Sequence, residues 1–140
     1  MNLAEKESNL SSCQKLKVGV CLVKNDRIIV LAHNYNIYGI NCTNDYHKCN
    51  RDKADGCRDA IHAEQEIINK IISNNILKED IVNSTLYLTH SPCIVCAKLL
   101  KLLQISRVVY KYSYAEYKGL QEDEGVILLK NFCDVVQLNC

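Results

Sequence analysis

His62-Ala63-Glu64 and Pro92-Cys93-Ile94-Val95-Cys96 are the two most informative stretches of this sequence. One histidine and two cysteines supply three ligands of the kind that zinc prefers. A tetrahedral ion held by them keeps its fourth position open for water, as catalytic zinc sites do, whereas structural sites usually close all four. Glu64 follows the histidine by two residues, where its carboxylate could exchange protons with that water.

The Cys93-x-x-Cys96 pair has two other common interpretations, a redox dithiol and half of a four-cysteine zinc ribbon. A redox pair has no need for an upstream histidine and glutamate, and a ribbon requires a second Cys-x-x-Cys, which this sequence lacks. Taken singly, His62 could be an ordinary histidine near a helix terminus, and Glu64 a favourable acid in a first helical turn. The combination, with Pro92 ahead of the cysteines, predicts a catalytic zinc site.

Length and composition agree with a small-molecule enzyme. The 140 residues are most simply a single domain, 1–140, large enough to bury a core without disulfides. The net charge of +1 argues against tracking a polynucleotide backbone and for a small substrate. The chain has nine cysteines but no secretory signal at its start, so we expect reduced thiols and a cytoplasmic location. No apolar run is long enough to cross a membrane.

Hydrophobic patterning predicts an α/β fold. A β-hairpin comes first, with strands at 18–23 and 27–32 around an Asn25-Asp26 turn. Strands and helices then alternate, which implies parallel crossovers in a five-stranded mixed sheet with helices on both faces. The remaining strands are expected at 85–89, 107–112 and 134–138, and the helices at 3–13, 60–73, 93–103 and 123–132.

Both predicted ligand groups fall at helix starts. Unpaired backbone amides and the helix dipole favour negative charge there, so the pKa values of Cys93 and Cys96 should be lowered toward the thiolate form. The two cysteines, three residues apart on one helical turn, present sulfur to the same point. Pro92 suits a helix start because its missing amide proton costs nothing there.

These motifs resemble those of the zinc-dependent cytidine deaminase superfamily, and most closely the deoxycytidylate (dCMP) deaminases. The resemblance covers nearly the whole chain. It includes Ser11-Ser12-Cys13 ahead of Val18-Gly19-Val20, Tyr35-Asn36, Thr85 to Thr89 and Arg107 to Tyr110. It implies a three-layer α/β/α cytidine deaminase-like fold and hydrolytic conversion of a cytosine nucleotide or nucleoside, foremost dCMP to dUMP, with release of ammonia.

The resemblance also implies roles for individual residues. Zinc would be held by His62, Cys93 and Cys96, and Glu64 would carry the proton between water, ring and leaving amine. Substrate contacts would come from the Ala63 amide on the 2-oxo group, the Ser91 carbonyl on the departing amine, Asn36 on the sugar hydroxyl with Asn34 as competing candidate, and Tyr114. Members commonly assemble, so a homo-oligomer is expected.

The chain departs from the dCMP deaminase pattern near the expected nucleotide site. The branch carries Gly-Tyr-Asn-Gly where this chain reads Asn34-Tyr35-Asn36-Ile37, and asparagine and alanine where this chain has Glu66 and Ile67. These differences leave open whether the substrate is a monophosphate, and whether deoxynucleoside triphosphates control activity. Other functions also stay open. The enzyme could deaminate cytidine or adenosine in RNA or DNA, or another small nucleobase. The chain could also be a zinc-stabilised subunit without activity.

The long segment between Asn36 and Ala60 needs something to order it. Two interpretations are open: a second, structural zinc site, or a polar insertion with incidental thiols. Some dCMP deaminases resemble the first case in carrying an additional zinc. The candidate ligands of a second zinc are Cys42, His47, Cys49 and Cys57.

Overall fold

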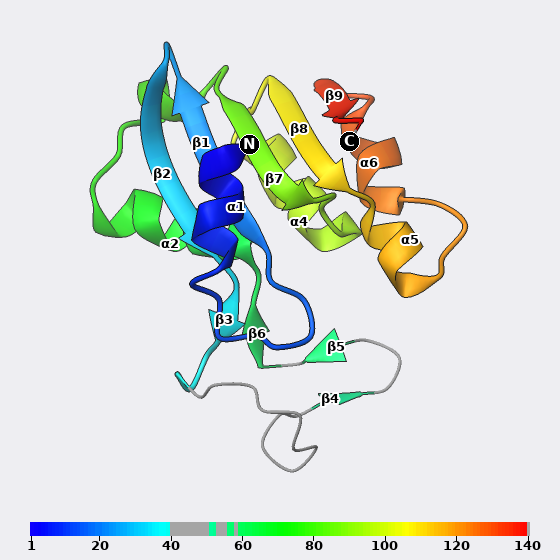
Figure 1. Cartoon of the computed structure of the whole chain (residues 1–140). Helices are drawn as coiled ribbons and strands as arrows, with labels where there is room; N and C mark the ends of the chain where they lie inside the picture. Colours follow the sequence, from blue (N-terminus) through cyan, green and yellow to red (C-terminus); the bar gives the residue numbers. More distant parts are fainter. Residues whose placement is uncertain (40–50, 53–55, 58, 140) are drawn as a thin grey trace.

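The computed structural model describes residues 1–39, 51–52, 56–57 and 59–139. Its centre is a five-stranded sheet with the strand order β2-β1-β7-β8-β9 (Figure 1). The predicted five-stranded mixed sheet is therefore confirmed. The strands are β1 (Gly19–Lys24), β2 (Arg27–His33), β7 (Thr85–His90), β8 (Arg107–Tyr112) and β9 (Asp134–Gln137).

The sheet changes from antiparallel to parallel at β7. Strand β1 pairs antiparallel with both β2 and β7, whereas β7, β8 and β9 run parallel. The β1–β2 hairpin turns at Asn25 and Asp26, whose φ angles of 49° and 59° are the positive values that a tight two-residue turn requires. Because β7 and β8 are parallel, their carboxyl ends lie at the same edge of the sheet, with His90 opposite Tyr112.

Helices cover both faces of the sheet. Helix α1 lies on one face and α2 and α4 on the other (Figure 1), so the predicted three layers are present. Buried residues of β1, α2 and α4, among them Val20, Ile67 and Leu100, share one apolar core. The helices beyond the sheet are α1 (Asn2–Ser8), α2 (Ala63–Ser73), α3 (Lys78–Ile81), α4 (Ile94–Leu102), α5 (Tyr114–Lys118) and α6 (Glu124–Leu129).

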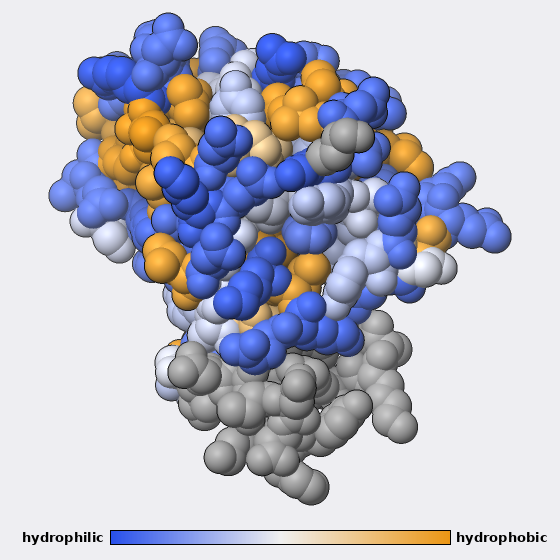
Figure 2. All heavy atoms as spheres, viewed as in Figure 1, coloured by the Kyte–Doolittle hydropathy of each residue, from blue (hydrophilic) through white to orange (hydrophobic). Residues whose placement is uncertain are grey.

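Helix α1 touches the sheet at Gly19. A Cβ atom at this position would lie 2.0 Å from the Ala4 carbonyl oxygen, so only glycine admits the helix this closely. Ala4 and Ser8 face the sheet and are buried. The surface seen from the same side is hydrophilic where α1 lies (Figure 2), as expected for the outer face of an amphipathic helix.

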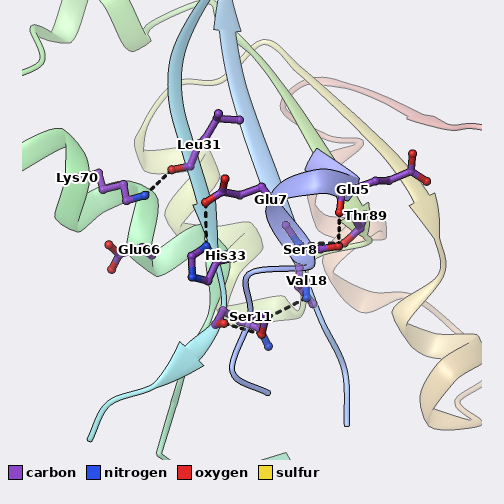
Figure 3. A network of polar contacts seen from close by, with 12 residues as sticks. Glu5, Glu7, Ser8, Ser11, Val18, Leu31, His33, Glu66, Lys70 and Thr89 are labelled. Carbon is purple, nitrogen blue, oxygen red and sulfur yellow. Dashed lines mark hydrogen bonds and ion pairs between the residues drawn. The ribbon is translucent and has the colours of Figure 1, made fainter. Parts of the chain in front are cut away.

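Polar contacts fasten the helices to β2 from both sides of the sheet (Figure 3). On the α1 side, His33 Nδ1 lies 2.8 Å from Glu7 Oε1, and both side chains are largely buried. On the α2 side, Lys70 Nζ donates to the Leu31 carbonyl at 2.6 Å. The edge strand β2 is thus tied to one helix in each outer layer.

Several boundaries differ from the sequence prediction. Helix α1 ends at Ser8 rather than at 13, because Ser11 turns away to donate from its hydroxyl to the Asn34 carbonyl at 2.7 Å. The helix expected at 60–73 begins at Ala63, since residues 60–61 form a short strand instead. The helix expected at 123–132 covers only Glu124–Leu129. The short strands are β3 (Tyr35–Asn36) paired with β6 (Ala60–Ile61), and β4 (Arg51–Asp52) paired with β5 (Gly56–Cys57).

In the part of the chain that the structure describes, no helix is long and apolar enough to span a membrane.

Candidate metal centre and substrate pocket

His62 is the residue immediately before helix α2, rather than a member of its first turn as expected. Its position is fixed on both sides. Tyr35 and Asn36 of β3 pair with Ile61 and Ala60 of β6, which brings the chain to His62 in extended form. The His62 backbone N–H then donates to the Gln65 side-chain oxygen at 2.9 Å, one half of a helix-capping arrangement.

Cys93 occupies the equivalent position before helix α4, and Cys96 lies in the first turn of that helix. The strand β7 delivers the chain to this point through Ser91 and Pro92, both of which are buried. Helix α6 presses on the same loop. A Cβ atom at Gly125 would lie 2.0 Å from the Pro92 carbonyl oxygen and 2.9 Å from the Cys93 carbonyl carbon. Gly125 therefore allows α6 to pack directly against the backbone that holds Cys93.

The three predicted ligands converge. His62 Nδ1 lies 3.8 Å from Cys93 Sγ and 3.4 Å from Cys96 Sγ, and all three ligand atoms lie within 4.8 Å of one another. Tetrahedral zinc with ordinary Zn–S and Zn–N bonds places a nitrogen and a sulfur about 3.6 Å apart, so the spacing fits the ion. No other group of three or more His, Cys, Asp or Glu side chains with this property occurs among the described residues.

The charges of the two thiols also call for a cation. A hydrogen bond with Cys96, aided by His62, lowers the pKa of Cys93 to about 4. The same hydrogen bond with Cys93, together with burial, raises the pKa of Cys96. One thiolate therefore forms readily while the second is opposed by the first. A coordinated divalent cation removes this conflict, because a metal-bound thiol is deprotonated outright.

Glu64 lies in the first turn of α2, on the same pocket as His62 and Cys93, and is 4% exposed. Burial raises the pKa of its carboxyl group above the ordinary glutamate value. A glutamate with a raised pKa holds a proton more readily than an exposed one, which suits a group that must both accept and release a proton. Because three ligands are already present, the Glu64 oxygens are not needed for the metal.

A single pocket contains most of the predicted site residues. Its walls include all the predicted substrate contacts except one, Asn36, which is buried but does not line the pocket. The residues that the prediction and the pocket share are Asn34, His62, Ala63, Glu64, Ser91, Cys93 and Tyr114, while the Cys96 sulfur lies beneath them.

The two competing asparagines have different surroundings. Asn34 lines the pocket, but its side chain is engaged with the protein: Oδ1 accepts from Ser11 and from the Val18 amide at 2.7 and 2.8 Å, and Nδ2 donates to the Leu16 carbonyl at 2.8 Å. Asn36 Oδ1 accepts from the Tyr38 amide at 2.9 Å. Asn34 thus shapes the pocket wall and joins the loop before β1 to the end of β2.

Sequence reasoning did not assign several further pocket residues to the site, among them Lys15, His90, Tyr117 and Lys118. Lys118 Nζ lies 5.7 Å from the centre of the Tyr114 ring, and the Tyr117 hydroxyl donates to the Lys15 carbonyl at 3.1 Å. Burial lowers the pKa of His90, so this ring is neutral at pH 7. Lys118 and the two tyrosines share one short helix, and their one-turn spacing was the only available signal.

The candidate ligands of a second zinc are not placed by the structure. Cys42, His47 and Cys49 lie outside the described residues, and for Cys57 only the backbone, in β5, is described.

The model of the cytidine and deoxycytidylate deaminase zinc-binding region matches residues 1–112. The chain belongs to this family. The predicted deaminase family and hydrolytic reaction class are therefore confirmed, and the cluster of His62, Cys93 and Cys96 suits the zinc ion that the family binds.

Relatives and solved structures agree. This deaminase is 31% identical over 136 residues to ComE operon protein 2 of Bacillus subtilis strain 168, covering 86% of the chain and 69% of that protein. It is 28% identical over 135 residues to deoxycytidylate deaminase of Saccharomyces cerevisiae, covering 94% of the chain but only 40% of the yeast protein. The crystal structure of dCMP deaminase from cyanophage S-TIM5 in complex with dCMP and dUMP superposes with a TM-score of 0.75 at 26% identity, covering 98% and 92% of the two chains.

Proposed function

We propose that this deaminase converts dCMP to dUMP by zinc-dependent hydrolysis. The observation that carries the proposal is the convergence of His62, Cys93 and Cys96 beside a buried Glu64, in one pocket that also holds two lysines. The relatives named deoxycytidylate deaminase, and the similar structure that contains dCMP and dUMP, support the same substrate.

His62 Nδ1 and the sulfur atoms of Cys93 and Cys96 would hold the zinc ion. Zinc bound there would lower the pKa of a water molecule, which supplies a nucleophile at neutral pH. Glu64 accepts one proton from this water and delivers it to the ring nitrogen as the oxygen adds to C4. It then takes the remaining proton from the new C4 hydroxyl and gives it to the amine. The C4–N bond breaks, ammonia departs and a C4 carbonyl remains.

Backbone groups orient the pyrimidine ring. Ala63 begins helix α2 at the pocket wall, and the first amides of a helix have no intrahelical acceptor, so its N–H is suited to the 2-oxo group. Ser91 donates its backbone N–H to the Tyr112 carbonyl at 2.8 Å, which holds the residue whose own carbonyl would accept from the amine. The contact between Asn36 and the sugar hydroxyl stays a prediction.

Lys15 and Lys118 favour a monophosphate over a nucleoside. Both line the pocket that contains the proposed metal site, and Lys118 lies over Tyr114. We call the part of the pocket formed by Lys15 and Lys118 the rim. A phosphate bound at the rim would face these two positive charges, whereas a nucleoside has no negative group to pair with them. These two lysines would therefore take over the phosphate recognition that the dCMP deaminase branch assigns to residues missing from positions 34–38 of this chain.

An ammonia-release assay tests the substrate. Wild-type protein and Glu64→Ala are compared on dCMP, CMP, deoxycytidine, cytidine, cytosine and short single-stranded DNA and RNA. We expect dCMP to give the highest kcat/KM, and the variant to lower the activity by a factor of roughly a hundred to ten thousand. A higher kcat/KM for any nucleoside, free base or oligonucleotide would overturn the dCMP assignment.

We also propose that the protein is a cytoplasmic homo-oligomer. The five cysteines whose side chains the structure describes are all free thiols, in keeping with a reducing compartment. Light scattering on the purified protein measures the assembly, and a monomeric mass would contradict this proposal.

A second zinc at Cys42, His47, Cys49 and Cys57 remains a proposal from the sequence. Metal analysis decides it, because two zinc ions per chain are expected with this site and one without it.

A further inference from the structure

Asp123 makes hydrogen bonds that differ from those expected of an aspartate at the start of a helix. It immediately precedes helix α6, where an aspartate ordinarily accepts from the helix's own first amides. Here its side chain makes no such bond. Instead both carboxylate oxygens are directed to residues outside α6, across the loop that joins α5 to α6.

Three donors from two walls of the pocket meet this carboxylate. Ser91 and Ser113 each donate a hydroxyl to Asp123 Oδ2 at 2.7 Å, and the Ala115 amide donates to Oδ1 at 3.3 Å. Ser91 belongs to the loop after β7 that leads to Cys93, whereas Ser113 and Ala115 begin helix α5. The Asp123 side chain therefore links the loop that leads to Cys93 with helix α5, which contains Lys118.

The arrangement continues through the Ser91 hydroxyl. While donating to Asp123, this oxygen accepts from the Tyr114 amide at 2.7 Å. Ser113 in turn accepts from the Glu116 amide at 3.1 Å and so caps α5. Ser91 is only 3% exposed, so its hydroxyl depends on these protein partners rather than on water.

Helix α5 needs such an anchor. It has five residues, too few to be stable alone in water. Yet three of those residues, Tyr114, Tyr117 and Lys118, line the pocket. Figure 1 shows α5 beyond the end of β8, away from the layers of the core. The parallel pairing of β7 with β8 sets Ser91 and Ser113 side by side, within reach of one carboxylate.

We propose that Asp123 is a positioning residue that fixes Ser91 and helix α5 relative to the zinc ligands, and so sets the substrate-binding side of the pocket. The inference rests on the proposed function for its kinetic consequence. It does not need a catalytic role for Asp123, which touches neither the ligands nor Glu64 in any described contact. A carboxylate is required because all three partners are donors, and an amide would turn an N–H group toward one of them.

The experiment compares Asp123→Ala with Glu122→Ala, the exposed acid next to it. We expect Asp123→Ala to lower kcat/KM for dCMP by about a hundredfold, the scale on which a small misplacement of substrate-positioning groups acts. Zinc content should equal that of wild type. Glu122→Ala should stay within about twofold of wild type, because a surface substitution away from such contacts has little effect.

A second readout is independent of the substrate. Trypsin cleavage after Lys118 in the native protein reports release of α5, since cleavage requires the local backbone to open. Asp123→Ala should be cut at this bond at least about tenfold faster than Glu122→Ala, which reflects the loss of roughly one or more kcal/mol of local stability. If α5 is released in this way but wild type fails to act on dCMP, the substrate assignment is wrong and the positioning role stands.

A third measurement separates positioning from general stability. Ser113→Ala and Asp123→Ala act on one hydrogen-bonded unit, so the double variant should lose much less kcat/KM than the product of the two single losses. If Asp123→Ala loses zinc or fails to fold, Asp123→Asn replaces it in every assay, with an expected loss between wild type and about a hundredfold. The proposal would be overturned if the loss in the double variant equals the product of the two single losses. It would also be overturned if the Asp123 variant matches Glu122→Ala in both trypsin cleavage rate and kcat/KM.

Discussion

The proposed zinc ligands and the lysines that line the same pocket are held in contrasting ways. His62 and Cys93 stand at the starts of α2 and α4, two helices that pack on the main sheet and contribute to its core. Lys15 lies in a loop, and Lys118 lies on the five-residue α5. The proposed chemistry thus depends on regular structure, and the proposed recognition of the substrate depends on segments that a few polar contacts hold in place. Changes in the first region should abolish the reaction, and changes in the second should redirect it.

The largest effect should come from removing a metal ligand. His62→Ala deletes one of three ligands, so we expect loss of bound zinc and of all measurable deamination. His90→Ala is the matched control, because His90 lines the same pocket without belonging to the ligand cluster. Metal analysis and ammonia release check both variants. Full zinc occupancy in His62→Ala would refute the ligand assignment.

Next comes the proton carrier. Glu64→Ala should lower kcat by a factor of roughly a hundred to ten thousand, the range attributed to acid–base catalysis, while zinc content and folding stay nearly unchanged. Glu66→Ala provides a control two residues along the same helix, where the carboxylate bonds to Tyr35 rather than facing the pocket. Equal kcat values for wild type and Glu64→Ala would mean that another group moves the proton.

At the rim the effect should be smaller and selective. Lys15→Ala or Lys118→Ala should raise KM for dCMP about tenfold, on the scale of one charge-assisted hydrogen bond, and leave deoxycytidine unaffected. Added salt should weaken dCMP binding by wild type more than by either variant, because exposed charges are screened. The exposed Lys98 of α4 is the control. A parallel loss for nucleotide and nucleoside would show that the lysines do not recognise phosphate.

Substitutions at two glycines separate an effect on overall stability from an effect on the proposed metal site. Gly19→Ala and Gly125→Ala both force a Cβ atom to within 2.0 Å of a carbonyl oxygen, so each should lower the free energy of unfolding by about 1–3 kcal/mol or more. Only Gly125 presses on the backbone of Cys93, so only its variant should also weaken zinc affinity. Denaturant titration and chelator competition measure the two effects. Equal zinc affinities in Gly19→Ala and Gly125→Ala would show that the packing of α6 does not affect the metal site.

The smallest effect is a chemical difference among thiols. In chelator-treated protein, a Cys93 pKa of about 4 leaves this residue a thiolate at pH 6, whereas burial raises the pKa of Cys21 above its usual value. Iodoacetamide should modify Cys93 first, and the rate should fall as the pH is lowered through about 4. Peptide mapping measures the order. Faster labelling of Cys21 would contradict the predicted pKa order.

Sequence alone predicted that the candidate metal ligands would meet where two helices begin. His62, Glu64, Cys93 and Cys96 were recognisable because spacing along a helix start determines where their side chains point, and the core strands carry clear β patterns. The boundary errors have local causes. Residues 60–61 were assigned to a helix, but they pair with β3, a contact between distant segments that no local pattern reports.

The rim could not be predicted for the same physical reason. Lys15 and Lys118 are ordinary surface lysines in the sequence, and they meet only because the loop before β1 and helix α5 converge on one pocket. Asp123 resembles any helix-capping aspartate until its partners are known. Asn34 and Asn36 were left as competitors, and their different surroundings emerge only from contacts made across the fold.

The switch from antiparallel to parallel pairing at β7 has a consequence for the order of folding. The β1–β2 hairpin closes through neighbouring residues, whereas His62 and Cys93 are 31 positions apart and meet only after the central strand has joined the sheet. Long-range closure of this kind is slow. During refolding, zinc uptake should therefore lag behind hairpin formation, so the metal would record completion of the sheet rather than initiate it.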